Sequence, residues 1–238
     1  MEPVTVDVVV IGAGQAGLSA AYHLQRRGFV PQPRAAAGDD TFVVLDANPQ
    51  PGGAWQHRWE SLKMATVNGI HELPGFAVPP ADPRSASRDI LPPYFAAHEE
   101  RYALDVQRPL AVRAVRRADG DPDGRLLVET DRGTWAARFV VNATGTWTRP
   151  FWPHYPGQER FGGRQLHVAD YVSADEFTGQ RVVIVGAGMS KSSSTHSGSR
   201  RVTQNVSATC EISSSSWTAE TPAPTMTTRC PANSSAET

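Results

Sequence analysis

The sequence lacks a charge excess of either sign, long hydrophobic runs and, over most of its length, cysteine. Its 238 residues carry 23 Lys and Arg against 24 Asp and Glu, so no strong field attracts nucleic acid or an anionic membrane surface. The longest apolar runs, such as Val8–Ile11 and Val182–Val185, are far shorter than the roughly 20 residues of a membrane-spanning helix. Residues 1–7 lack the basic start and apolar core of a signal peptide. We therefore expect a soluble, cytoplasmic protein that binds neither nucleic acid nor membranes.

The last 48 residues differ in composition from the rest of the chain. Residues 1–190 contain no cysteine, whereas Cys210 and Cys230 both lie in this tail, together with 12 Ser, 9 Thr and no Leu or Phe. A segment with so few large aliphatic groups cannot bury enough surface to offset the entropy of ordering it. We expect residues 191–238 to be a disordered, low-complexity tail whose cysteines are free thiols rather than a disulfide.

A glycine-rich turn stands near the start of the chain. Residues 6–11 are typical of a strand buried on both faces. The segment Gly12-Ala13-Gly14-Gln15-Ala16-Gly17 follows at once, and apolar residues then recur at helical spacing until Gly28. Strand, glycine turn and helix in this order are the context that a G-x-G-x-x-G motif needs to bind a dinucleotide. The alternative for an isolated motif of this kind is a plain turn.

Each glycine of this turn has a separate physical role. Gly12 permits the tight turn, Gly14 lets backbone amides approach a pyrophosphate, and Gly17 lets the helix lie close to the strand. The helix dipole then points its positive end at the anion. We predict that residues 12–17, including Gln15 and Ala16, bind the diphosphate.

An acidic residue ends the next predicted strand, at residues 42–45. Asp46 can accept hydrogen bonds from both hydroxyls of an adenosine ribose and would repel a 2′-phosphate. It comes 29 residues after Gly17, where about 20 are usual. Residues 31–40, rich in Pro, Ala, Gly and Asp, explain the excess as a surface loop.

A second glycine pair lies close behind the acid. Gly52, Gly53 and Trp55 belong to the segment P-G-G-A-W, and a second glycine pair near the first phosphate loop favours FAD over NAD. Here the sequence resembles the superfamily of flavin-containing and Baeyer–Villiger monooxygenases. The resemblance implies that this G-G-x-W segment runs beside the flavin. The alternative is a surface turn with a packed tryptophan.

The middle of the chain predicts a helix and a small meander. Residues 90–102 have helical spacing, with Tyr94, Phe95 and His98 on one side. Residues 110–117, 126–130 and 135–141 alternate like strands. The resemblance implies that Val112 offers its backbone to adenine, although a valine in a strand is also ordinary core. It also implies that Ala143 and Gly145, in an A-T-G element, give clearance at the FAD site, where the alternative is a simple turn.

Residues 161–171 carry the most discriminating pattern. They satisfy F-x-G-x-x-x-H-x-x-x-Y, the fingerprint of the monooxygenase superfamily, with Phe161, Gly163, His167 and Tyr171 at the fixed positions. Tyr171 followed by Val172 departs from the Baeyer–Villiger pattern and favours the N- and S-oxygenating side. The resemblance implies that His167 is the catalytic residue of this fingerprint and couples hydride delivery to oxygen chemistry, without acting as a general base. Read from the residues alone, His167 could be an ordinary loop histidine.

A second phosphate loop begins but is not continued. Residues 180–185 predict another buried strand, and Gly186 and Gly188 open a loop that the resemblance assigns to NADPH. Lys191 and a run of serines stand where a helix of apolar periodicity should follow. The abrupt change suggests a shifted reading frame or an exon-type artefact, and one permitted codon choice that restores an apolar, helix-like sequence after residue 190 supports the shifted frame. We expect the chain to lack most of the NADPH domain.

The predicted fold is α/β. Residues 1–150 are expected to form a Rossmann-like FAD-binding domain with a β-meander. Residues 151–190 are expected to form a linker with the fingerprint and the start of an NADPH-binding Rossmann domain, and the disordered tail follows. The resemblance implies an FAD- and NADPH-dependent monooxygenase that uses a flavin C4a-hydroperoxide to transfer oxygen from O2 to a small molecule, with this chain an inactive or impaired fragment. One alternative is a non-enzymatic FAD-binding remnant. Another is a two-dinucleotide reductase, which would need a Cys-x-x-Cys that is missing here. No metal site is predicted, and the substrate and oligomeric state stay open.

Overall fold

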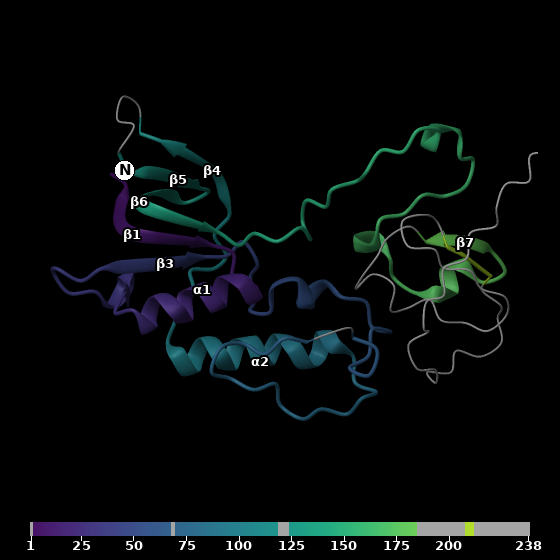
Figure 1. Ribbon diagram of the computed structural model, residues 1–238, viewed down its shortest axis with the longest axis horizontal. Coiled ribbons are helices and arrows are strands. Elements are labelled where there is room, and N and C mark those ends of the chain that lie inside the picture. Colours follow the sequence, from purple (N-terminus) through teal and green to yellow (C-terminus); the bar gives the residue numbers. More distant parts are fainter. Residues whose placement is uncertain (1, 68–69, 119–123, 185–207, 212–238) are drawn as a thin grey trace, which may run out of the picture. The chain divides into compact units, whose positions relative to one another are not determined.

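The structure is a computed structural model that describes residues 2–67, 70–118, 124–184 and 208–211 (Figure 1). It divides into two compact units, Met1–Tyr171 and Val172–Thr238, and each is considered by itself below. The predicted domain boundaries at residues 150 and 190 stay predictions. No helix of the described segments has the length and apolar character to cross a membrane.

A mixed sheet forms the framework of the first unit. Its strands are β1 (Val4–Ile11), β2 (Val30–Pro31), β3 (Thr41–Leu45), β4 (Val112–Arg117), β5 (Leu126–Thr130) and β6 (Gly133–Asn142). Among the described residues they stand in the order β2-β3-β1-β6-β5-β4. The first four are parallel to one another, whereas β5 runs antiparallel to both β6 and β4. This arrangement confirms the predicted Rossmann-like α/β fold.

The predicted meander and the parallel sheet share one strand. Strand β6 pairs with β1 from Trp135 to Asn142, and its first half, from Gly133 to Ala137, also pairs with β5. The meander therefore continues the parallel sheet instead of forming a separate sheet. Its pairing also places the carboxyl end of β6 beside the carboxyl end of β1, where Ile11 faces Asn142.

Helix α1 (Gln15–Arg26) follows β1 as predicted. It ends through Gly28, which has φ +91°. The amides of Gly28 and Phe29 donate to the carbonyls of Gln25 and Leu24, respectively. These bonds satisfy carbonyls that the end of a helix otherwise leaves free.

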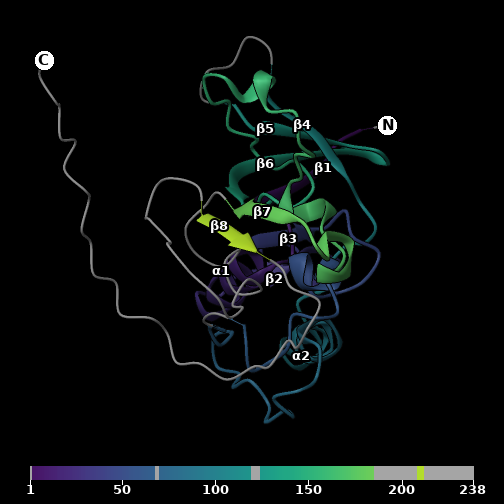
Figure 2. The same cartoon turned by 90° about the vertical axis from the view of Figure 1, so that its right-hand side faces the viewer.

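Helix α2 (Ser87–Tyr102) begins three residues before the predicted start at residue 90 and includes Pro92 and Pro93. Both views place α1 between the sheet and α2 (Figures 1 and 2). Tyr94, Phe95 and His98 are all buried, which confirms the predicted inner face of this helix.

Two hydrophobic clusters cover the two faces of the central strands. The first contains residues of β1, α1, β3 and α2, among them Val10, Leu18, Phe42 and Leu91. The second contains Val9 and Val43 together with Val128 of β5. Burial on both faces explains why β1 and β3 are near-continuous apolar runs.

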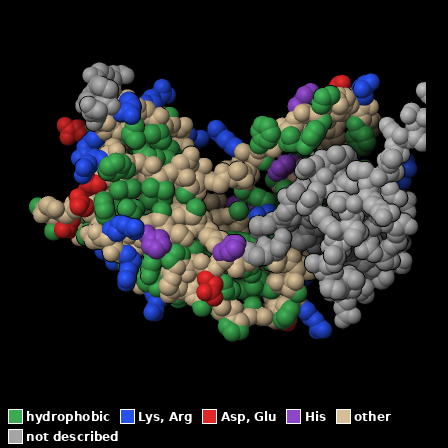
Figure 3. Space-filling view, viewed as in Figure 1, with side chains coloured by type: hydrophobic (Ala, Val, Ile, Leu, Met, Phe, Trp, Pro, Cys, Tyr) green, Lys and Arg blue, Asp and Glu red, His purple; other side chains and the backbone are tan. Residues whose placement is uncertain are grey.

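Short 3₁₀ helices complete the described chain. They are η1 (Gln32–Arg34), η2 (Gly53–His57), η3 (Gln158–Arg160), η4 (Val168–Asp170) and η5 (Ala174–Phe177). The predicted surface loop at 31–40 contains η1 and is mostly exposed, except that its first residue, Pro31, belongs to β2 and is buried. In the segment after β6, Phe151, Trp152, Tyr155 and Phe161 are exposed, and Figure 3 shows hydrophobic side chains over it.

The second unit contains β7 (Arg181–Ile184), where the sequence predicts a strand, and β8 (Ala208–Glu211). These two strands pair antiparallel, from Arg181 with Glu211 to Ile184 with Ala208. Residues 208–211 belong to the tail 191–238, for which the sequence predicts disorder, and that disorder stays a prediction. The rest of that tail lies outside the described residues.

Candidate nucleotide-binding site

The glycine turn lies where the carboxyl ends of three parallel strands meet. The Gly12 amide donates to the Leu45 carbonyl at 2.7 Å, and the Ala143 amide donates to the Ile11 carbonyl at 2.9 Å. These bonds tie the loop after β1 to the ends of β3 and β6. A crevice at the carboxyl ends of such strands is the usual ligand site of an open α/β sheet.

Close packing explains two of the three motif glycines. Gly12 has φ +98°, and a Cβ atom there would collide with the Ala143 carbonyl. A Cβ atom on Gly17 would collide with the Gly12 carbonyl. Both positions therefore need glycine for the protein's own backbone to pack, which agrees with the predicted tight turn and close helix.

Gly14 differs from its neighbours because nothing described lies within 4 Å of a Cβ atom built on it. It is the N-cap of α1, adopts an extended backbone conformation, and no acidic residue occupies the first turn that follows. The first amides of a helix have no partners within the helix, so Gln15, Ala16 and Gly17 present free donors to an anion. The absence of a side chain at Gly14 keeps the approach to them open.

The second glycine pair packs against the first. Gly52 has φ +114°, and a Cβ atom there would lie 2.7 Å from the Cβ of Pro92 in α2. A Cβ atom on Gly53 would lie 2.9 Å from the Cα of Gly14. The two glycine segments, 38 positions apart between Gly14 and Gly52, thus form one bare backbone surface. This juxtaposition is what the sequence predicts for a long dinucleotide.

The A-T-G element lies at the same place. Ala143 contacts the glycine turn through its carbonyl, and its own Cβ would lie 3.5 Å from a Cβ built on Gly17. Gly145 has φ +64°, and nothing described lies within 4 Å of a Cβ atom built on it. A small side chain at Ala143 and none at Gly145 leave clearance beside the turn.

Asp46 follows β3 and is 3% exposed. Its Oδ1 accepts from the Asn48 amide at 3.1 Å and from Asn48 Nδ2 at 3.0 Å. Its buried Oδ2 has no hydrogen-bond partner among the described residues. An unsatisfied buried carboxylate oxygen is costly, and a ligand hydroxyl would satisfy it. Asp46 therefore fits the predicted ribose acid.

The strand that contains Val112 approaches this acid. The Leu110 amide donates to the Asp46 carbonyl at 2.8 Å, and the Gln107 carbonyl accepts from the Asp46 amide at 3.0 Å. Val112 itself begins β4, packs against the second hydrophobic cluster and pairs with Thr130. The contacts bring the Val112 segment to the ribose end of the site, while its part in binding adenine stays a prediction.

Sequence reasoning missed a buried charge cluster behind Asp46. Arg108 places Nη1 and Nη2 each 2.7 Å from a different oxygen of Glu99, and its Nη2 lies 3.6 Å from Asp46 Oδ2. Burial raises the pKa of Glu99, and the hydrogen bonds and charge of Arg108 act in the opposite direction. No local pattern reveals this cluster, because Asp46 and Glu99 are 53 positions apart and meet only in the fold.

Arg58 was also missed, and it lies among tryptophans. Its guanidinium carbon is 5.5 Å from the ring centre of Trp55, 5.8 Å from that of Trp59 and 4.5 Å from that of Trp147. Burial lowers the pKa of Arg58. Cation–π contacts of this kind stabilise a buried cation, and they connect Trp55 of the second glycine segment to the chain after the A-T-G element.

His167 is not brought to the glycine turn by any described hydrogen bond or ring contact. Its Nδ1 accepts from the Ala169 amide at 3.1 Å, so it caps η4, and its ring lies 5.8 Å from that of Trp152. Tyr171 of the same fingerprint meets Trp59 edge-on at 5.3 Å. The catalytic role of His167 stays a prediction. Gly186 and Gly188 lie outside the described residues.

Residues 9–229 match the family model described as pyridine nucleotide-disulphide oxidoreductase. This chain belongs to that family. The following similarities show that it also belongs to the superfamily of flavin-containing and Baeyer–Villiger monooxygenases. The flavin-containing monooxygenase from Stenotrophomonas maltophilia is 41% identical with a TM-score of 0.60, over 74% of this chain and 49% of that one. A Baeyer–Villiger monooxygenase of Streptomyces coelicolor is 30% identical, over 78% of this chain and 34% of its own length.

A third relative is similar at the level of fold. Cyclohexanone monooxygenase from Rhodococcus sp. Phi1, bound to NADP+, is 24% identical with a TM-score of 0.50, over 75% of this chain and 33% of that one. This chain therefore spans about half the length, or less, of these family members. Among the described residues, no three His, Cys, Asp or Glu side chains gather as a metal site.

Proposed function

We propose that this chain binds the ADP half of FAD and that the protein is an FAD-dependent monooxygenase that uses NADPH and O2 to oxygenate a small molecule. The observation that carries the proposal is the contact of Gly53 with Gly14. This contact joins both glycine segments into one surface. A diphosphate can approach the backbone of this surface closely, because no glycine side chain stands in the way.

Different residues of this chain would bind different parts of the cofactor. The first turn of α1 would hold the diphosphate, Asp46 the adenosine ribose, and Ala143 and Gly145 would give the cofactor room. Trp55, beside Arg58, would border the path towards the flavin. The flavin supplies the redox and oxygen chemistry when it is bound, and the protein supplies binding and orientation.

The family supports the oxygenase part of the proposal. The S. maltophilia relative is named a flavin-containing monooxygenase, and the cyclohexanone monooxygenase structure holds NADP+. For this chain, Gly186 and Gly188 are the residues proposed to meet NADPH, and His167 to couple the two cofactor sites. The cytoplasmic location likewise stays a proposal.

FAD titration of the purified full chain tests the binding step. We expect saturable binding by calorimetry and a flavin absorption spectrum that stays with the protein after gel filtration. In Gly14→Ala, no described atom lies within 4 Å of the added methyl group, but the methyl group lies in the proposed path of the diphosphate. We expect a tenfold or greater loss of FAD affinity, about 1.4 kcal/mol, with only a small loss of thermal stability, because alanine is a poorer N-cap than glycine. Equal FAD affinities of the two proteins would contradict the proposal.

A second candidate function is FAD binding without turnover. The second phosphate loop favours it, since Lys191 and a run of serines follow Gly188 where an NADPH-binding helix of apolar periodicity is expected. NADPH oxidation by the FAD-loaded chain separates the two: NADPH-dependent O2 uptake above that of free FAD supports the monooxygenase, and its absence with FAD bound supports the second candidate.

A further inference from the structure

Three ionisable side chains meet at the carboxyl end of β3. Asp46 comes from the strand end, Glu99 from α2, and Arg108 from the segment that returns from α2 to the sheet. Their side chains are only 4%, 11% and 11% exposed in the two ion pairs that they form. Two acids thus share one cation in a buried place, and the cation cannot satisfy both fully.

Arg108 contacts the two acids unequally. Glu99 takes both terminal nitrogens of Arg108 at 2.7 Å each, the bidentate geometry in which guanidinium and carboxylate fit best. Asp46 Oδ2 lies 3.6 Å from Arg108 Nη2, beyond a hydrogen bond, and within the described chain no other group donates to it. A carboxylate oxygen is therefore held buried, near a positive charge and without a donor.

We propose that Glu99 is a positioning residue for the ribose acid: by holding both terminal nitrogens of Arg108, it keeps this cation off Asp46 Oδ2 and leaves that oxygen free for a ribose hydroxyl. The inference rests on the proposed function, because it deepens the assignment of Asp46. It also explains why Arg108 Nη2 lies 3.6 Å from Asp46 Oδ2 without forming a hydrogen bond to it. The cation stabilises the ionised acid through space, and the hydroxyl of the ligand completes the hydrogen bonding.

The charges also disfavour a phosphate at this place. With Asp46 and Glu99 both ionised, the cluster carries one negative charge in excess over Arg108. Both terminal nitrogens of the guanidinium are engaged by Glu99, and they cannot turn to a 2′-phosphate without leaving Glu99 unpaired and buried, which is costly. The cluster therefore selects a free ribose hydroxyl, as in the ADP half of FAD.

The test compares two probes, ADP and 2′,3′-dideoxy-ADP, by calorimetry on the full chain. Their affinity ratio reports the hydrogen bonds to the ribose and is insensitive to changes that weaken both ligands equally. For the wild-type chain we expect a ratio of at least about tenfold in favour of ADP, as hydrogen bonds to a charged group imply. In Glu99→Gln, Arg108 is released to bond Asp46 Oδ2, and we expect the ratio to fall below about threefold.

Two further variants separate positioning from simple damage. In the double variant Glu99→Gln/Arg108→Gln the competing cation is absent, so the ratio should rise again towards the wild-type value, while Asp46 keeps the two hydrogen bonds from Asn48. Glu100→Gln changes an exposed acid of the same helix and should leave the ratio unchanged. This recovery in the double variant is a result that a purely structural role of Glu99 does not produce.

The outcomes distinguish the inference from the proposed function. A wild-type chain that binds neither probe would contradict nucleotide binding, and with it this inference. A wild-type ratio near one would overturn the role of Asp46 while nucleotide binding stands. An undiminished ratio in Glu99→Gln, or a ratio that stays low in the double variant, would overturn the positioning role alone.

Discussion

At the scale of single residues, the site is built as much from missing side chains as from present ones. Gly12 and Gly17 are needed because the protein's own backbone occupies the space of their Cβ atoms, whereas the space at Gly14 is open. The same motif therefore contains positions that serve folding and a position that serves the ligand. Substitution should separate the two effects.

Gly17→Ala should destabilise the fold. The added methyl group would collide with the Gly12 carbonyl and approach the Cβ of Ala143, so α1 must move away from β1. We expect a loss of about 1–3 kcal/mol in the free energy of unfolding, as for other overpacked sites, measured by urea denaturation. Gly14→Ala is the matched control, and equal stabilities of the two variants would show that the close packing at Gly17 is unimportant.

Asp46→Asn should weaken FAD binding. The amide replaces the negative charge near Arg108 and turns one acceptor oxygen into a donor that cannot receive a ribose hydroxyl. We expect FAD to bind about tenfold or more weakly, since a hydrogen bond to a charged group is worth roughly 1.5–3 kcal/mol. Asp40→Asn, in the exposed loop before β3, is the control for the loss of one negative charge. An affinity unchanged in Asp46→Asn would remove this residue from the site.

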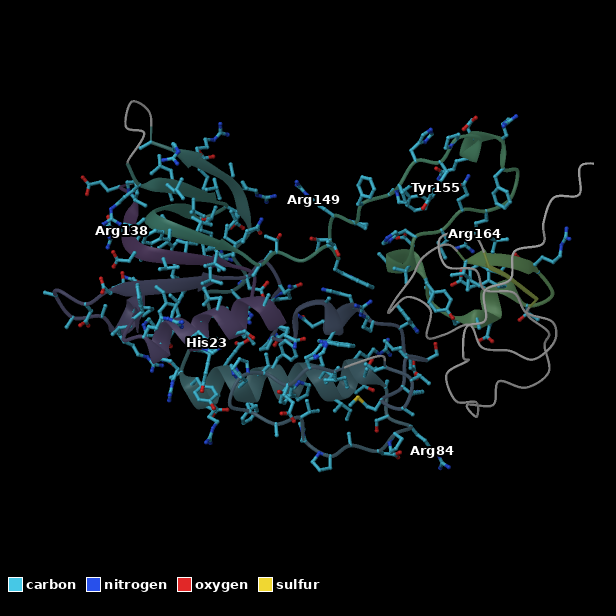
Figure 4. The ribbon with its side chains drawn as sticks, in the orientation of Figure 1. His23, Arg84, Arg138, Arg149, Tyr155 and Arg164 are labelled. Atoms are coloured by element: carbon cyan, nitrogen blue, oxygen red, sulfur yellow. The ribbon has the colours of Figure 1, made fainter. Side chains whose placement is uncertain are left out.

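At the scale of elements, α2 is held against α1 by an aromatic cluster around His98. The His98 ring lies 6.1 Å from Tyr22 of α1 and 4.8 Å from Tyr102 of α2, and its Nε2 is 3.2 Å from the Pro74 carbonyl. Figure 4 shows side chains from both helices filling the space between them. Because α2 also carries Glu99 and meets Gly52 through Pro92, this contact supports the nucleotide site.

His98 should make the fold sensitive to mild acid. Burial lowers the pKa of His98, with the bond to Pro74 acting in the opposite direction, so the ring stays neutral in the fold at a pH where it is protonated in the unfolded chain. The unfolded state then binds more protons, and stability falls as pH decreases below about 6.5 towards the folded pKa. We expect a loss of up to about 1 kcal/mol between pH 7.5 and 5.5 from this group.

Urea denaturation at the two pH values measures this loss. In His98→Phe an aromatic ring remains but cannot be protonated, so the difference between pH 7.5 and 5.5 should shrink. His23→Gln, which changes an exposed histidine of α1, should keep the wild-type difference. If His98→Phe keeps it as well, another group causes the pH dependence.

The elements that could be predicted are those whose signal is local. The strand–turn–helix of residues 6–26 needs only a buried apolar run, three glycines and helical periodicity, and the structure confirms it. The dual pairing of β6 could not be predicted, because its residues alternate like any strand and its partners are chosen by the whole sheet. For the same reason Asp46 was identified from its strand end, whereas Glu99 and Arg108 were not, since they meet it only through the return of α2 to the sheet.

At the scale of the whole molecule, the residues assigned to the ADP half of FAD all belong to the first unit. They run from Gly12 to Gly145, and their mutual contacts lie within the sheet, α1, α2 and the connecting loops. The segment after β6 leads through Tyr155, labelled in Figure 4, to the fingerprint around His167. Binding of the cofactor's ADP half and its use in catalysis are therefore expected to depend on different parts of the chain.

A chain that stops after Tyr171 should keep the affinity for ADP. Every residue proposed to contact ADP is retained, so we expect the ADP affinity to stay within about threefold of the full chain. Calorimetry measures the affinity, and thermal unfolding followed by circular dichroism shows whether the shortened chain is folded. The same shortened chain carrying Gly14→Ala serves as the control, because it should lose ADP binding while its fold persists. A folded shortened chain that binds ADP tenfold more weakly would show that residues beyond Tyr171 contribute directly to the site.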